Sequence, residues 1–160
     1  MFKICSKRGT KVIGREIKEH NNLFFVCSLI EYIARKVKLN RDTVANSIGK
    51  KELNKIFNLA DVYHSENIDE ISDELITKFS IASGSFTTES LYALPSHWDI
   101  GKVYKRLIID IIQHEQIDFI SALVKAYNSP ISRKIENFNS SFYYENPSYI
   151  FACYSEGKAL

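Results

Sequence analysis

Apolar residues recur at three- and four-residue steps along most of the 160-residue chain. This spacing is typical of one face of an α-helix. The clearest case is residues 17–38, which end in a basic cluster suited to the negative end of a helix dipole. No segment alternates apolar and polar residues long enough to predict a strand. The apolar stripe of residues 17–38 consists of Leu23, Val26, Ile30, Ile33 and Val37.

Start and stop signals divide the rest of the chain into shorter helices. Asn40 is placed to cap a short helix that Gly49 ends, and a third helix is expected over about residues 50–64. Asn67 is placed to cap the next helix, with Glu70 at the reciprocal capping-box position. In the second half, the capping residues Ser96, Ser129 and Asn146 and the apolar spacing predict helices over residues 97–115, 117–127, 130–138 and 147–156.

The helical periodicity is interrupted over residues 80–95, which contain Ser, Gly and Thr and end at Pro95. Within this segment, residues 88–93 allow one helical turn. The sequence therefore predicts an all-α protein with an N-terminal helical unit at 1–79, a linker at 80–95 and a C-terminal helical unit at 96–160. We expect the two units to share or abut their cores, and the last helix to be rich in aromatic residues. Gly101, inside a predicted helix, indicates close packing there, because glycine costs about 1 kcal/mol of helix propensity relative to alanine.

Charge is unevenly distributed, although the formal net charge is only +2. Residues 1–60 hold 13 Lys and Arg against 5 Asp and Glu, whereas residues 61–100 hold 1 against 8. A basic and an acidic stretch can face each other in the fold, or each can face a partner. The simpler expectation is that folding brings the two stretches together or that solvent covers both.

The acidic stretch begins at "VYHSENIDEISDELI", in which His64 is followed by five carboxylates. The pattern could form a metal or acid–base site only if the turn folded back on itself. The alternative is a helix start with a solvated face, since carboxylates in a first turn are favoured by the helix dipole. We prefer the second interpretation and expect neither a metal site nor a cofactor. The five carboxylates are Glu66, Asp69, Glu70, Asp73 and Glu74.

Nothing in the sequence indicates a catalytic constellation. There is no GxSxG turn, no phosphate-binding loop and no HExxH pair. The cysteines Cys5, Cys27 and Cys153 are odd in number and widely spaced, which is typical of reduced thiols in a cytosol. The longest apolar run is far shorter than a membrane span. The sequence therefore predicts a non-enzymatic, cytoplasmic protein that does not enter a membrane.

Two kinds of partner are consistent with the sequence. The aromatic tail, "FNSSFYYENPSYIFACY", suits a protein interface, because tyrosine combines a large contact area with a polar tip. A protein partner could contact Tyr143 and Tyr144, together with Asp69 and Asp73 of the acidic helix. Alternatively, the basic helices of residues 29–57 could bind DNA, with phosphate contacts from Lys50, Lys51 and Lys55.

Residues 29–79 resemble a bacterial family of short helical proteins known only as a domain of unknown function. The resemblance rests on an amphipathic helix ending in a basic pair, a short helix, and "DVYHSENIDEISDELI", with Tyr63 directly before His64. It covers about a third of the chain and implies no catalytic residue. The family is often encoded beside toxin-like ADP-ribosyltransferase genes, which implies an antitoxin or immunity role. We therefore expect an interaction protein of that kind, with a DNA-binding regulator as the alternative.

Overall fold

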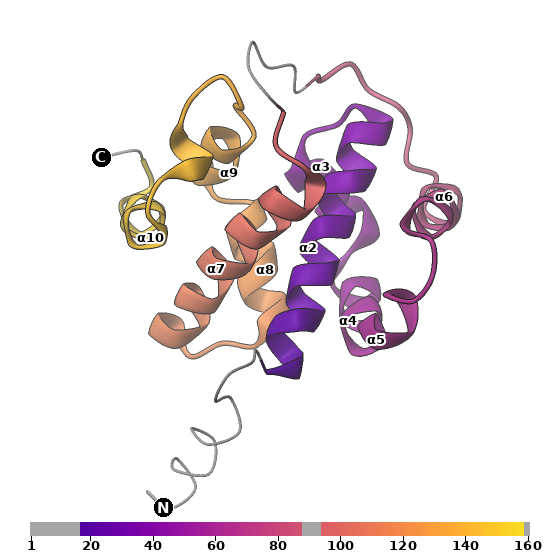
Figure 1. Cartoon of the computed structure of the whole chain (residues 1–160), viewed down its shortest axis with the longest axis horizontal. Coiled ribbons are helices and arrows are strands. Elements are labelled where there is room, and N and C mark those ends of the chain that lie inside the picture. Colours follow the sequence, from indigo (N-terminus) through magenta and orange to yellow (C-terminus); the bar gives the residue numbers. More distant parts are fainter. Residues whose placement is uncertain (1–16, 88–93, 159–160) are drawn as a thin grey trace, which may run out of the picture.

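The protein is all-α, as the sequence predicts. Our computed structural model describes residues 17–87 and 94–158, which contain nine α-helices, a short 3₁₀ helix and no strand (Figure 1). None of the helices in these two ranges is long and apolar enough to cross a membrane. The α-helices are α2 Lys18–Val37, α3 Arg41–Ile48, α4 Lys50–Asn58, α5 Ala60–Tyr63, α6 Ile68–Lys78, α7 His97–Glu115, α8 Phe119–Tyr127, α9 Pro130–Ile135 and α10 Pro147–Glu156; η1 is Phe142–Tyr144.

The two longest helices, α2 and α7, lie side by side at the centre and make the most extensive helix–helix contact (Figure 1). Gly101 of α7 lies against Ser28 of α2. A Cβ atom added at Gly101 would lie 2.1 Å from Ser28 Oγ and 2.9 Å from the Ser28 backbone nitrogen. The close packing predicted at Gly101 is therefore confirmed, and it is what allows the two helices to approach each other.

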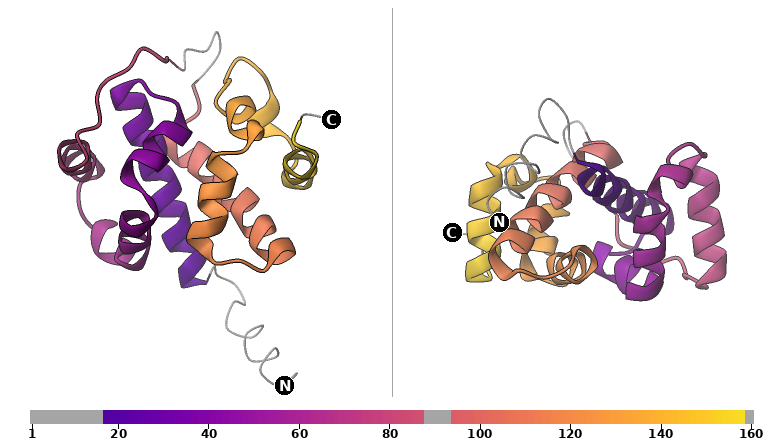
Figure 2. Two further views of the ribbon diagram at one scale, coloured as in Figure 1. Left: turned by 180° about the vertical axis from the view of Figure 1, so that it is seen from behind. Right: turned by 90° about the horizontal axis from the view of Figure 1, so that it is seen from below.

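The remaining helices surround this pair. Helices α4, α5 and α6 lie beyond α2, while α9 and α10 lie at the opposite end of the molecule, beyond α7 (Figure 2). Helix α8 packs on α7, α3 and α4, so it connects the two sides. The buried apolar residues from both sides form one continuous cluster, as expected for two helical groups that share a core.

Helix α2 is buried over more of its circumference than a single stripe. The five stripe residues predicted from the sequence are buried, but so are Phe25, Leu29, Ser28 and Glu31. A helix that is apolar on several sides lies inside a protein. Helix α2 is therefore a central helix of the whole molecule.

Several predicted boundaries and caps differ from the structure. The third predicted helix is divided at Leu59 into α4 and the short α5. Asn40 does not cap α3 through its side chain. Instead, the Glu136 carboxylate accepts hydrogen bonds from the Arg41 backbone N–H (3.0 Å) and from Asn40 Nδ2 (2.5 Å). A carboxylate distant in sequence thus replaces the local cap.

Two further caps can be compared with the sequence prediction. Asn67 does cap α6, because its side chain accepts a hydrogen bond from the Asp69 N–H. Ser96 and Asp99 form a complete capping box at the start of α7.

The described part of the predicted linker lies along the end of α2. The Gly84 N–H donates to the Val37 carbonyl (2.8 Å), and the Phe86 N–H donates to the Lys38 carbonyl (2.9 Å). Residues 81–87 therefore cover carbonyl groups that a helix C-terminus leaves without partners. The helical turn considered for residues 88–93 lies outside the described residues.

Candidate functional site

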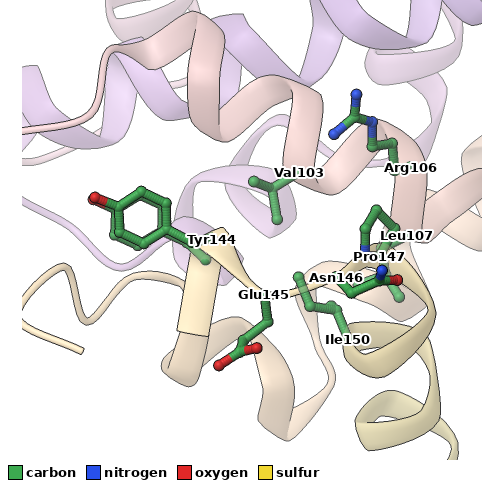
Figure 3. A pocket seen from close by; sticks show the side chains of 9 residues that line it. Val103, Arg106, Leu107, Tyr144, Glu145, Asn146, Pro147 and Ile150 are labelled. Carbon is green, nitrogen blue, oxygen red and sulfur yellow. The ribbon is translucent and has the colours of Figure 1, made fainter. Parts of the chain in front are cut away.

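The candidate site is a surface pocket of about 280 Å³ between α7 and the segment that leads into α10 (Figure 3). Its floor is apolar, and its rim carries tyrosine and polar side chains. The floor and wall are formed by Val103 and Leu107 of α7, with Pro147 and Ile150 of α10. The other lining residues are Arg106, Tyr143, Tyr144, Glu145 and Asn146.

A chain reversal before α10 places the two tyrosines. Phe142 is buried and anchors the 3₁₀ turn, while Asn146 caps α10 by accepting a hydrogen bond from the Ser148 N–H (2.9 Å). Pro147 occupies the first turn of α10, where its missing N–H costs no helical hydrogen bond. These local constraints leave Tyr143 and Tyr144 beside α7.

The tyrosines form a stacked pair whose outer member faces solvent. Their ring centroids are 4.5 Å apart, and the Tyr143 ring also packs edge-on against buried Phe138 at 5.5 Å. Tyr144 is 74% exposed, the highest value among the exposed large hydrophobic residues of the described chain. Partial burial and a hydrogen bond with Tyr144 raise the pKa of Tyr143, so its hydroxyl stays protonated at neutral pH. The pair thus presents an aromatic surface that is held in place by the packing of Tyr143 on buried Phe138.

The charged residues of the pocket are arranged around its edge. In Figure 3, the guanidinium of Arg106 and the carboxylate of Glu145 point to opposite sides of the apolar floor. Both residues are exposed. The arrangement is an apolar centre with a charged rim, which is the usual anatomy of a protein-binding surface.

Asp69 and Asp73, the other predicted partner contacts, lie on α6 at the far end of the molecule from α10 (Figures 1 and 2). Lys36 Nζ lies 2.6 Å from a carboxylate oxygen of each. Asp69 also accepts a hydrogen bond from the Tyr32 hydroxyl at 2.8 Å. The Lys36 ammonium, followed by Tyr32, lowers the pKa of Asp69. The four predicted contact residues therefore do not form one surface, and Asp69 and Asp73 have partners within the chain.

The basic and acidic stretches meet in the fold, which is one of the two arrangements that the simpler charge prediction allows. Besides the pairs at Lys36, Lys18 lies 3.1 Å from Asp61, and Lys78 of the acidic stretch lies 3.1 Å from Glu52 of the basic one. Ser72, which the helical pattern places outward, is in fact buried between α6 and α2 and accepts a hydrogen bond from Lys36 Nζ at 3.1 Å. The carboxylates of α6 therefore help to attach that helix to α2.

His64 follows α5, and its ring lies near aromatic rings, with Asp61 lining the same surface pocket. Its ring centroid is 5.7 Å from that of Phe25 and 6.3 Å from that of Trp98. Within residues 17–87 and 94–158, no group of three His, Cys, Asp or Glu side chains is placed to hold a metal ion. The exposed histidine therefore lies at the edge of an aromatic cluster.

The lysines proposed for DNA binding lie on α4. All three are exposed, and Lys50 also donates a hydrogen bond to Ser121 of α8 (2.8 Å). Gly49 alone separates α3 from α4, which is shorter than the turn of about three to four residues in a helix-turn-helix. DNA binding by this segment remains a prediction.

Sequence reasoning named the tyrosines as candidate contacts but did not indicate the α7 side of the pocket that they line. Arg106 and Val103 lie some forty residues before Tyr144, and only the tertiary fold brings them together. Comparisons with protein-family models, curated proteins and solved structures gave no match. The resemblance of residues 29–79 therefore remains a prediction, and the site is interpreted from its geometry alone.

Proposed function

We propose that the protein is a non-enzymatic interaction protein that binds a protein partner through the pocket between α7 and α10. The observation that carries the proposal is Tyr144, which is 74% exposed yet stacked on a ring anchored in the core. A large aromatic side chain held rigidly at the surface loses little conformational entropy on binding. Tyrosine and arginine dominate the residues that contribute most to interface energies.

The size of the pocket favours a protein partner over a small molecule. Its volume of about 280 Å³ is at the lower limit of ligand pockets, which usually enclose roughly 300–1,000 Å³. It can accept one bulky apolar side chain of a partner, with Tyr144 and Arg106 contacting the surrounding surface. The antitoxin or immunity role implied by the family resemblance is one form that such an interaction could take, and we include it in the proposal.

The proposal is tested with Tyr144→Ala and Arg106→Ala, compared with Val62→Ala. Val62 is a suitable control because it is 57% exposed and lies on α5, away from the pocket. Each form is used to isolate partners from the cells of origin, and the recovered proteins are quantified. A partner recovered with the wild type is then purified, and its dissociation constant is measured for every variant. We expect Tyr144→Ala and Arg106→Ala to weaken binding about tenfold or more, and Val62→Ala to leave it unchanged.

Two results would contradict the proposal. One is a purified partner that binds the wild type and Tyr144→Ala with equal affinity. The other is the recovery of no stoichiometric protein with the wild type. Unfolding curves of the variants test whether weaker binding reflects a loss of structure. We expect no loss of stability, because Tyr144 and Arg106 are both exposed.

A further inference from the structure

Two further hollows open along one face of α2, and the accessible lining of both is mainly apolar. The first, of about 270 Å³, lies beside α5 and is lined by Lys18, Asn22 and Phe25 of α2. The second, of about 330 Å³, lies beside α6 and the start of α7 and is lined by Tyr32 and Lys36 of α2. Lys18 and Tyr32 are two heptads apart, as are Asn22 and Lys36. The two hollows therefore face the same side of α2, about 21 Å apart along its axis.

A row of aromatic rings joins the two hollows. Between ring centroids, Phe25 in the first hollow lies 5.7 Å from His64, and His64 lies 6.3 Å from Trp98. Trp98 lies 4.6 Å from His97, which lies 5.0 Å from Tyr32 in the second hollow. Phe25 is buried, Trp98, His97 and Tyr32 are half-buried, and His64 is exposed. We call these five residues the aromatic strip.

An apolar strip with a hollow at each end has the shape that receives an amphipathic helix. In that mode of recognition, the helix lays its apolar stripe in a groove and anchors it with side chains from successive turns. A helix of about 14 residues is long enough to reach from one hollow to the other. Helices α5 and α6 lie on one side of α2, and α7 lies on the other (Figure 1). The strip thus runs along α2 between two walls of helices.

The wall formed by α6 is acidic. Asp69 and Asp73 share one ammonium group, because Lys36 Nζ lies 2.6 Å from a carboxylate oxygen of each. Glu70 and Glu74 are exposed and have no cationic partner in residues 17–87 and 94–158. These two glutamates are one turn apart, a spacing at which like charges on a helix repel each other. A positively charged partner would relieve this repulsion and complement the wall.

We propose that the aromatic strip is the docking site of a basic amphipathic helix from a partner protein. The apolar side chains of that helix fill the two hollows, and its lysine and arginine side chains face α6. This surface is separate from the pocket between α7 and α10, because α6 and α10 lie at opposite ends of the molecule (Figure 2). The inference therefore does not depend on the function proposed above.

The fluorescence of Trp98 provides a direct test, because this residue is the single tryptophan of the chain and belongs to the strip. The full chain is titrated with a synthetic helical peptide of about 18 residues that carries leucine along one stripe and lysine elsewhere. One control peptide has glutamate in place of lysine, and the other has the same composition with its leucines scattered. We expect a saturable change with the first peptide that weakens as salt is added, and binding about tenfold weaker or less with both controls.

Three results of the titration would overturn the proposal. The first is the absence of a saturable change with the leucine–lysine peptide, and the second is equal binding of the peptide with scattered leucines. The third is self-association of the chain without peptide, seen as a concentration-dependent change in both Trp98 fluorescence and sedimentation. A second copy would then occupy the strip in place of a basic helix.

Matched variants test whether the peptide binds at the strip. Glu74→Lys on α6 should weaken binding of the leucine–lysine peptide about threefold or more, whereas Glu156→Lys, the same change at an exposed position of α10, should leave it nearly unchanged. His64→Ala removes the exposed ring of the strip and should weaken binding to a similar extent. Equal effects of the two lysine variants would show attraction by general surface charge and would also overturn the proposal. Tyr144→Ala should retain peptide binding, so the strip and the pocket beside α10 can fail independently.

Discussion

The crossing of α2 and α7 depends on the missing side chain of Gly101. Its α-carbon faces the Ser28 backbone so closely that an added Cβ would lie 2.9 Å from the Ser28 nitrogen and 3.0 Å from the Ser28 Cα. Backbone atoms cannot rotate away as a flexible side chain can. The spacing of the two central helices is therefore set at this one residue.

Gly101→Ala should destabilise the protein although alanine is the better helix former. We expect the free energy of unfolding to fall by about 1–3 kcal/mol, since the two helices must move apart, despite a gain of about 1 kcal/mol in helix propensity. Denaturant unfolding of the variant and the wild type measures the difference. Ser28→Ala is the control, because the Ser28 hydroxyl is buried without a partner among the described residues and its loss should cost little. Equal stability of Gly101→Ala and the wild type would show that the helices can separate freely.

At the scale of single residues, the sequence does not predict which charged residues are buried in the core. Arg41 is only 1% exposed and makes two hydrogen bonds to the equally buried Glu31, at 2.7 and 2.5 Å. Nothing in the sequence distinguishes Arg41 from the other basic residues of the N-terminal half. Its burial depends on Glu31, ten positions earlier, and its backbone N–H is bonded to Glu136, 95 positions later. No local sequence pattern predicts such pairs.

At the scale of helices, α6 is attached to α2 by polar as well as apolar contacts. Lys36 lies between Asp69 and Asp73 and also donates to Ser72, while Tyr32 donates to Asp69. Beneath them, Ile71 and Leu75 are the buried apolar residues of α6. Exposed ion pairs contribute little individually and are screened by salt. Helix α6 should therefore open more readily than the central pair of helices.

Asp69→Asn should increase amide hydrogen exchange in α6 by a few-fold at pH 7, while exchange in α2 and α7 stays unchanged. The pKa of Asp69 is lowered from its ordinary value of 3.8 by Lys36 and then Tyr32. A carboxyl of this kind stabilises the fold above pH 3.8 and loses that effect as the pH falls through its lower, folded-state pKa. The wild type and Asp69→Asn should therefore converge in strong acid. Glu70→Gln, at an exposed position of α6, is the matched control; an equal effect there would contradict a specific role for Asp69.

The sequence predicts helices well where caps and periodicity agree, and poorly where tertiary contacts decide. Helix α7 begins and ends as predicted, because Ser96 and Asp99 form a capping box and the apolar spacing is regular. The break at Leu59 between α4 and α5 follows no Gly or Pro signal. The candidate site shows the same difference between local and tertiary signals, since the aromatic tail of the sequence indicates its tyrosines as candidate contacts. The sequence does not indicate Arg106 as a site residue, because Arg106 comes close to that tail only in the folded protein.

At the scale of the whole molecule, the long-range polar contacts join the two halves of the chain. Glu136 of the second half receives hydrogen bonds from Asn40 and Arg41 of the first half, and Arg133 lies 3.0 Å from Asp42. The Tyr127 ring stacks on Tyr104 with centroids 4.0 Å apart, and its hydroxyl donates to the Cys27 carbonyl at 3.5 Å. Together with the contact between α2 and α7, these interactions place both halves around one core.

The division into units at 1–79 and 96–160 can therefore be tested as a statement about folding. Each half exposes its side of the interface between α2 and α7 when it is separated from the other, and the remaining core is small. We expect the full chain to unfold in one cooperative transition, and separate chains of residues 17–79 and 96–158 to show no cooperative transition under the same conditions. Thermal unfolding followed by circular dichroism measures this. A fragment that melts cooperatively near the temperature of the full chain would show instead that its half is an independent domain, and that α2 and α7 meet as two preformed surfaces.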